Sequence, residues 1–167
     1  MIKSILSSAP DVEDLNIAPV GYSTTILDSN GNEIDKLTTS GSNRIPVSID
    51  QIPTCLQYAF IDIEDERFYE HNGIDIKGIL RAGVQFLAGS KQGASTITQQ
   101  LLKNNVFEDG GFESNTGSLI KRKIQEQYLA MELEKTTSKA IILENYLNTI
   151  NLGSGCYGVQ AAAKRYF

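Results

Sequence analysis

Apolar residues recur at helical spacing along most of the chain after residue 53, which predicts a mainly α fold. Residues 54–71 carry such a stripe, and Pro53 suits the start of that helix because a first-turn residue needs no N–H partner. Residues 74–87 form a second amphipathic pattern, with the apolar positions on one side: Ile76, Ile79, Leu80, Val84 and Leu87. Further helices are predicted over residues 96–105, 119–134, 138–148 and 158–167. Thr96-Ile97-Thr98-Gln99 fits a capping box at the start of the first of these, and Ser138 is expected to cap the third. The buried face of that third helix is expected to consist of Leu143, Tyr146, Leu147 and Ile150.

Strand-like sequence is confined to the beginning of the chain. Residues 1–20 show little pattern and are expected to form an irregular lead-in. Two β-prone runs then flank Asn30-Gly31, a dipeptide that favours a hairpin with a type I′ turn, in which both central residues have positive φ. We therefore predict a small N-terminal β-hairpin within a lead-in segment, residues 1–50, followed by a helical domain, residues 51–167.

Composition narrows the possible partners. The chain has 167 residues and a net charge of -5, which argues against nucleic acid because phosphate binding usually needs a basic surface. A few lysines focused in one cleft can still bind an anionic substrate. No run of about 18 apolar residues is present, so no transmembrane helix is expected and the chain as given is predicted to be soluble. Cys55 and Cys156 are expected to be buried free thiols, and a disulfide between them is left open.

An acidic cluster ends the first predicted helix. Glu64 is expected in mid-helix one turn before Phe68, and a carboxylate against an aromatic ring in a cleft suits a general base. The alternative is that these acids form a solvated helix face. His71 could shuttle protons, but a structural role at the helix end is the stronger interpretation.

Two further sets of polar residues have the spacing of a helix face. Ser95, Gln99 and Lys103 are expected to form one stripe from a helix N-terminus, which suits sugar hydroxyls and phosphate oxygens. Arg122 and Glu126 are four residues apart, which indicates either a surface salt bridge or a second carboxylate facing the first across a cleft. For both sets, a solvated helix face is the plain alternative.

Five ordered motifs together resemble the peptidoglycan glycosyltransferases of glycosyltransferase family 51, the polymerase domains of penicillin-binding proteins and of monofunctional transglycosylases. The first two motifs are Glu64-Asp65-x-x-Phe68-x-x-His71-x-Gly73 and Gly93-x-Ser95-Thr96-Ile97-Thr98-Gln99-Gln100-Leu101-x-Lys103-Asn104. The others are Arg122-Lys123-x-x-Glu126-x-x-x-Ala130-x-x-Leu133-Glu134, Ile142-Leu143-x-x-Tyr146-Leu147-Asn148 and Gly158-x-x-x-Ala162-Ala163-x-x-Tyr166-Phe167. Five motifs in order over about 110 residues are a specific match.

The resemblance implies a lysozyme-like helical domain that joins lipid II units by β-1,4 links with inversion, releasing undecaprenyl diphosphate. It implies that Glu64 is the general base and that Glu126 orients basic residues or a divalent ion, Mg²⁺ or Mn²⁺, at the diphosphate; no other cofactor is expected, and no metal ligand is assigned. The residues predicted to bind substrate are Asp65, Phe68, His71, Ser95, Thr96, Gln99, Gln100, Lys103, Asn104, Arg122 and Lys123.

The resemblance also implies a cellular setting. The partners would be lipid II and the growing glycan, with an N-terminal membrane anchor and a transpeptidase domain that the chain as given lacks, and a location on the extracytoplasmic face of the bacterial membrane. Because the chain stops at the fifth motif, we expect the family's domain to continue beyond residue 167. Residues 88–94 fall where the family has a mobile region. Two alternatives stay open, a module that binds lipid II or moenomycin-like ligands without turnover and a lytic muramidase.

Overall fold

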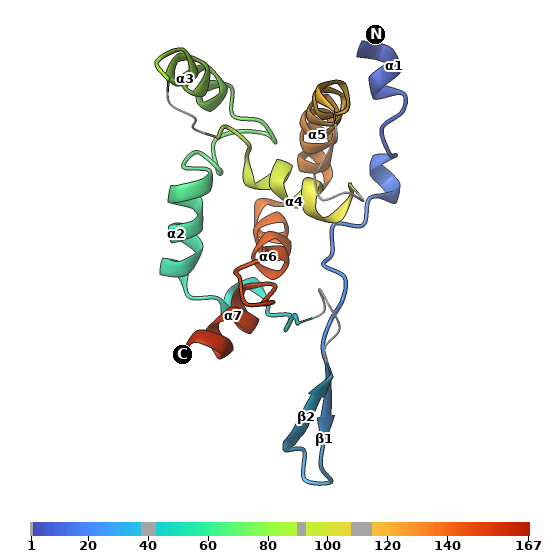
Figure 1. Ribbon diagram of the computed structural model, residues 1–167, viewed down its shortest axis with the longest axis vertical. Helices are drawn as coiled ribbons and strands as arrows, with labels where there is room; N and C mark the ends of the chain where they lie inside the picture. The colour runs from blue at the N-terminus through green and yellow to red at the C-terminus, as the bar shows by residue number, and fades with distance from the viewer. Residues whose placement is uncertain (1, 38–42, 90–92, 108–114) are drawn as a thin grey trace.

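The computed structural model describes residues 2–37, 43–89, 93–107 and 115–167 (Figure 1). The α-helices are α1 (Ile2–Leu6), α2 (Thr54–Glu64), α3 (Ile76–Leu87), α4 (Ile97–Asn105), α5 (Thr116–Thr136), α6 (Lys139–Thr149) and α7 (Val159–Tyr166). Two 3₁₀ turns, η1 (Val12–Asp14) and η2 (Ile49–Gln51), and the strands β1 (Thr24–Leu27) and β2 (Glu33–Leu37) complete the fold. The prediction of a mainly α fold with a small hairpin is confirmed.

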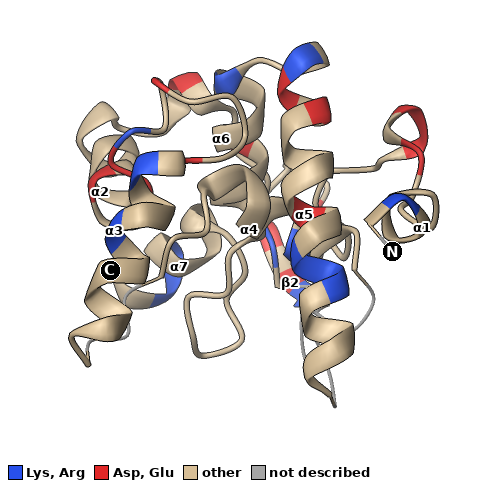
Figure 2. Cartoon of the chain, turned by 90° about the horizontal axis from the view of Figure 1, so that it is seen from above, with Lys and Arg blue, Asp and Glu red and all other residues tan. Residues whose placement is uncertain are grey.

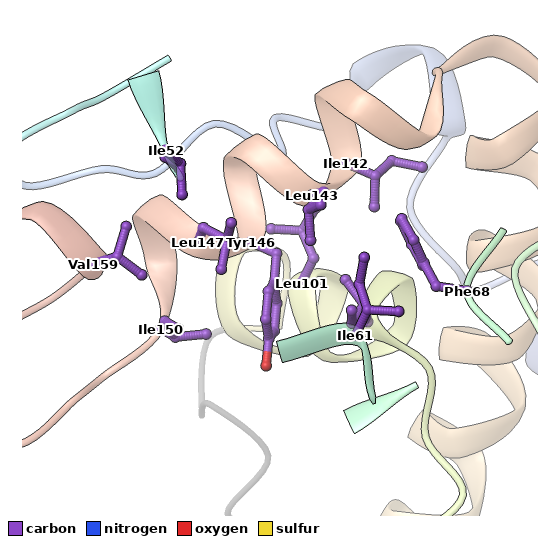
Figure 3. Close-up of a cluster of buried hydrophobic side chains, with 11 residues drawn as sticks. Ile52, Ile61, Phe68, Leu101, Ile142, Leu143, Tyr146, Leu147, Ile150 and Val159 are labelled. Carbon is purple, nitrogen blue, oxygen red and sulfur yellow. The ribbon is translucent and has the colours of Figure 1, made fainter. Parts of the chain in front are cut away.

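The hydrophobic core lies where α4 packs against α6 and α5 (Figure 1). Figure 3 shows the main cluster, to which α6 contributes Ile142, Leu143, Tyr146 and Leu147. Leu143, Leu147 and Leu101 are fully buried, and burying each such side chain contributes about 1.5–3 kcal/mol. The predicted buried face of this helix is confirmed, and so is its N-cap, Ser138, whose hydroxyl accepts from the Ile141 N–H.

The hairpin projects from the helical body (Figure 1) and pairs β1 with β2 in antiparallel register, Thr24 opposite Leu37. The predicted type I′ turn is wrong. Gly31 has φ +84°, but Asn30 does not have positive φ; instead its N–H donates to the carboxylate of Asp28 at 2.8 Å. The Asp28 carbonyl accepts from the Gly31 N–H at 3.0 Å, so the aspartate side chain and backbone organise this turn.

The lead-in segment packs on the helical body, and the prediction that residues 1–20 are irregular is wrong in part. Helix α1 and turn η1 lie against α5. The side-chain amide of Gln125 donates to the Ile5 carbonyl at 3.1 Å, and that of Asn105 donates to the Ile17 carbonyl at 2.7 Å. A five-residue helix is too short to leave a periodic pattern in the sequence. The division at residue 50 stays a prediction, although the first part contacts the second.

Helix α2 ends at Glu64, seven residues before the predicted end at His71. Asp65 is the C-cap residue, and its carboxylate turns inward to accept from the Ile97 N–H at 3.0 Å. This long-range hydrogen bond diverts the chain out of the helix, a cause that local periodicity cannot reveal. Glu64 is therefore the last residue of a helix and does not lie within one.

The predicted amphipathic helix forms as α3. Its apolar side, however, is not buried against the core, where the apolar side of such a helix usually lies. Its only buried residue is Gly78, while Val84 is 69% and Leu87 88% exposed. Figure 1 shows α3 at the periphery, apart from the α4–α6 core. Among the helices in the described part of the chain, none combines the length and hydrophobicity that crossing a bilayer requires.

The two cysteines differ. Cys55 is exposed at the start of α2, which contradicts the prediction that it is buried, whereas Cys156 is buried as predicted. Both are free thiols, so the disulfide left open by the sequence does not form in this structure.

Candidate active site

A cavity of about 250 Å³ lies between the end of α2, the first turns of α3 and the start of α4. Its acidic lining residues are Asp62, Glu64, Asp65, Glu66 and Asp75. Arg81 of α3 also lines it, together with Ser95, Thr96 and Gln100 from the α4 side. The first two motifs found in the sequence therefore meet in one cavity, as predicted for a binding cleft.

Glu64 presents its carboxylate at this cavity from the exposed end of α2. The side-chain amide of Gln100 donates to Glu64 Oε2 at 2.9 Å. Phe68, expected beside this carboxylate, is fully buried instead, where it meets Tyr69 edge-on at 5.1 Å and lies beneath the Lys139 ammonium at 4.4 Å. The predicted aromatic wall beside Glu64 is wrong because the helix ends before Phe68, and Phe68 packs in the core.

Asp65 and His71 form a buried pair that fastens the turn after α2. His71 Nε2 donates to Asp65 Oδ1 at 2.9 Å, and the His71 side chain is only 8% exposed. The same carboxylate accepts the first N–H of α4, from Ile97. These contacts support the structural interpretation of His71 and give Asp65 a structural role at the edge of the cavity.

The N-terminus of α4 is organised by the capping box that the sequence predicted. Thr96 accepts from the Gln99 N–H at 3.2 Å, and Gln99 Oε1 accepts from the Thr96 N–H at 2.9 Å. The Thr96 hydroxyl donates to the Gly73 carbonyl at 2.7 Å. Gly73 must be glycine, because φ is +87° and a Cβ would lie 2.4 Å from the Ala130 carbonyl.

The predicted polar stripe along α4 is therefore wrong. Gln99 is buried in the capping box, so it does not face the cavity beside Ser95. Gln100 takes that place, one residue further along the helix. Lys103 is half-buried and Asn104 is exposed in the last turn of α4, and neither lines the cavity.

Arg122 and Lys123 form a basic cluster on α5, where Figure 2 shows Lys and Arg positions in blue. Glu126 is fully buried and forms ion pairs with Arg122 and with Lys123, the latter at 2.8 Å. Lys123 Nζ also donates to Ser95 Oγ at 3.1 Å, which joins the cluster to the cavity. The carboxylate thus holds two cations, but it does not line the cavity as the predicted second carboxylate would, and its salt bridge is not at the surface.

A salt-bridge network that the sequence did not reveal attaches α3 to the turn after α2. Arg67 binds Asp75 at 2.6 Å, and Arg81 binds Glu66 at 2.5 Å. The Arg67 guanidinium lowers the pKa of Asp75 against the opposing effect of burial. The pKa of Glu66 is lowered by its hydrogen bonds to Arg81 and Arg67. These partners are joined by an irregular turn, so no periodic spacing links them in the sequence.

The predicted divalent ion at the diphosphate would need side chains that are able to hold it. Within the described ranges, no group of three or more His, Cys, Asp or Glu residues is arranged to hold a metal ion. Glu126, predicted to orient basic residues or a divalent ion, is engaged by two cations. This acid does not fit the role of a metal ligand.

Comparison with known proteins identifies the family. Residues 30–167 match the model of the family described as transglycosylase. The chain is 44% identical over 173 residues to penicillin-binding protein 1A of Clostridium novyi (strain NT), which covers 98% of the chain and 19% of the relative. It is 46% identical over 172 residues to penicillin-binding protein 1A of Clostridium perfringens (strain 13 / Type A), covering 99% of the chain and 24% of the relative.

A relative with a different name supports the same family assignment. The chain is 47% identical over 147 residues to penicillin-binding protein 1F of Bacillus subtilis (strain 168), which covers 87% of the chain and 19% of the relative. The chain thus spans about a fifth of the length of these curated relatives. The family match covers the cavity, the basic cluster and the core between them, and the chain belongs to the transglycosylase family.

Proposed function

We propose that the chain is a peptidoglycan glycosyltransferase domain that polymerises lipid II, with Glu64 as the general base. The observation that carries the proposal is the position of Glu64 in a cavity that Ser95 connects to the basic cluster on α5. A carboxylate on one side and fixed cations on the other match a reaction that removes a proton and releases a diphosphate. The family match and the names of the relatives support the same reaction class.

The proposed reaction transfers a glycosyl group with inversion. Glu64 takes the proton from the 4-hydroxyl of the acceptor sugar, and that oxygen forms a bond to the anomeric carbon of the donor. The bond between this carbon and the diphosphate oxygen breaks, and undecaprenyl diphosphate leaves with the electron pair. Lys123 and Arg122, with Lys103 further along α4, stabilise the charge that develops on the diphosphate. A divalent ion at the diphosphate stays a prediction, and no step requires one.

The remaining predicted substrate residues divide into contact and support. Ser95 and Gln100 line the cavity and are proposed to meet the sugar, and Asn104 is proposed to bind substrate beyond it. Asp65, His71, Thr96 and Gln99 hold the turn and helix that present Glu64: His71 Nε2 donates to Asp65, Asp65 accepts from the Ile97 N–H, and Thr96 and Gln99 form the capping box. Phe68 supports the same turn from the core. We propose that these five residues act through packing and not through contact with substrate.

A lipid-linked substrate also accounts for the exposed side of α3. This helix begins beside the cavity, at Asp75 and Gly78, and presents apolar side chains to its surroundings. An exposed apolar helix face suits the interface of a membrane better than water. We infer that α3 lies against the extracytoplasmic membrane surface where lipid II resides. A membrane anchor and a transpeptidase domain are proposed for the full-length protein.

Product analysis tests the proposal. The chain is incubated in detergent with labelled lipid II, and the glycan length is followed for the wild type, Glu64→Gln and the control Glu70→Gln, an exposed acid that does not line the cavity. We expect polymer from the wild type and the control and none from Glu64→Gln. Lipid II binding without polymer from any of them would support a binding module instead. Shortening of finished glycan would indicate a lytic muramidase.

A further inference from the structure

We propose that Tyr146 is a positioning residue that fixes Glu64 through the side-chain amide of Gln100. The inference rests on the proposed role of Glu64 as the base and extends it into the core. Tyr146 lies on α6, Gln100 on α4 and Glu64 at the end of α2, so three helices contribute one residue each. We call these residues the Tyr146–Gln100–Glu64 network.

Two hydrogen bonds form this network. The Tyr146 hydroxyl donates to Gln100 Oε1 at 3.3 Å, a long contact for such a bond, and Gln100 Nε2 donates to Glu64 Oε2 at 2.9 Å. Nε2 also lies 3.4 Å from the Ser95 carbonyl oxygen. Both ends of the amide are therefore engaged, one toward the core and the other toward the cavity.

Only one orientation of the Gln100 amide satisfies its neighbours. With Nε2 toward Glu64, its two N–H groups meet two acceptors, the Glu64 carboxylate and the Ser95 carbonyl. The reversed amide would place Oε1 against both acceptors, and the repulsion would push Glu64 away. The Tyr146 hydroxyl completes this orientation by donating to Oε1 at the inner end of the amide.

Tyr146 has the properties of a fixed donor. It is 2% exposed, and its ring meets Phe60 edge-on with ring centres 6.3 Å apart. Figure 3 shows the ring among the apolar side chains of the core, with its oxygen at the end away from α6. Burial raises the pKa of its hydroxyl, and the nearby charges of Glu64 and Asp65 act in the same direction. The hydroxyl thus keeps its proton at neutral pH.

Glu64 needs such support because its own surroundings leave it free to move. It occupies the last position of α2 and is exposed, so its side chain would otherwise sample several rotamers. Holding Oε2 through Gln100 leaves Oε1 to receive the proton of the acceptor hydroxyl. Tyr146 touches no substrate, yet it thereby reduces the conformational entropy that the Glu64 side chain must lose in order to react.

Tyr146→Phe removes the hydroxyl and keeps the ring, and Tyr166→Phe is the matched control. The Tyr166 hydroxyl donates to the Leu152 carbonyl at 3.0 Å, away from the cavity. We expect Tyr146→Phe to lower kcat for lipid II about three- to tenfold, the worth of one hydrogen bond, with KM unchanged. Tyr166→Phe should leave both constants unchanged.

A double-mutant cycle separates positioning from general packing. If Tyr146 acts through Gln100, adding Tyr146→Phe to Gln100→Ala should lower kcat no further, because the amide it orients is gone. An equal loss in both backgrounds would assign the effect to core packing and overturn the proposal.

A measurement without substrate keeps the test independent of the proposed activity. The order parameter of the Gln100 side-chain amide is measured by ¹⁵N relaxation in the free protein. We expect a rigid amide in the wild type and in Tyr166→Phe and a mobile one in Tyr146→Phe. An amide equally rigid in Tyr146→Phe would overturn the proposal even if the chain polymerises lipid II. A mobile amide in a protein without polymerase activity would support the positioning role and refute the proposed function.

Discussion

Helices α3 and α6 are similar in length, yet the structure uses them in opposite ways. Helix α6 buries Leu143 and Leu147 completely against α4, whereas α3 exposes Leu80 and Leu87. Ion pairs hold the beginning of α3 to the turn after α2, and hydrophobic packing holds α6. Apolar residues at helical spacing therefore predict that a helix forms, but not whether its apolar side is buried in the core or exposed.

The largest expected effect separates the two helices by stability. Leu143→Ala in α6 should lower the free energy of unfolding by about 2–5 kcal/mol, because it leaves a cavity in the core. Leu87→Ala in α3 should change it by less than about 0.5 kcal/mol, because that side chain is already in solvent. Urea unfolding followed by circular dichroism measures both. Equal losses would contradict the exposure of α3.

The ion pair that attaches α3 should be lost at acidic pH. The pKa of Asp75 is lowered in the folded protein, so the carboxylate stabilises the fold above its ordinary pKa of about 3.9. This stabilisation is lost as the pH falls through the lower folded pKa. Asp75→Asn should lower the free energy of unfolding by about 2–3 kcal/mol at pH 7, because the Arg67 guanidinium loses its charged partner.

Unfolding measured between pH 2 and 7 checks this prediction, with the pH limits set to bracket an ordinary carboxylate titration at about 4. The acid-dependent loss of stability should be smaller in Asp75→Asn than in the wild type. Asp50→Asn, a change at an exposed aspartate outside the network, is the control. An unchanged pH dependence in Asp75→Asn would mean that Arg67 does not hold α3 through this residue.

Membrane binding should respond to α3 and not to other exposed apolar residues. Leu87→Glu should weaken binding to lipid vesicles at least about tenfold, since burying one leucine contributes about 1.5–3 kcal/mol. Leu119→Glu places the same change on α5, where the leucine is 43% exposed. Vesicle co-sedimentation measures both, and the α5 variant should bind like the wild type. Equal weakening would show that α3 has no special contact with lipid.

Local sequence was sufficient for features determined by neighbouring residues. The caps at Thr96 and Ser138 depend on contacts three residues apart, and both were predicted correctly. The early end of α2 depends on Asp65 reaching Ile97, and the burial of Gln99 away from the cavity depends on how α4 packs in the fold. Such long-range contacts leave no periodic signal.

The site shows the same limit. Motif resemblance predicts that Glu64 and the α5 cations belong to one site, and in the structure the hydrogen bond between Ser95 and Lys123 links the cavity of Glu64 to these cations. Resemblance did not separate contact from support, since Phe68 shares a motif with Glu64 but lies in the core. No periodic spacing predicts the Arg67–Asp75 pair, because an irregular turn joins the two residues.

The most direct test of the account is the polymerisation rate of Glu64→Gln with lipid II binding measured on the same samples. Removing a general base while keeping the hydrogen-bonding shape of its side chain should lower kcat by about 10²–10⁴ and leave the affinity for lipid II nearly unchanged. A variant that polymerises at the wild-type rate would contradict the assignment of Glu64 as the base. Equal loss of binding and rate would make Glu64 a binding residue instead.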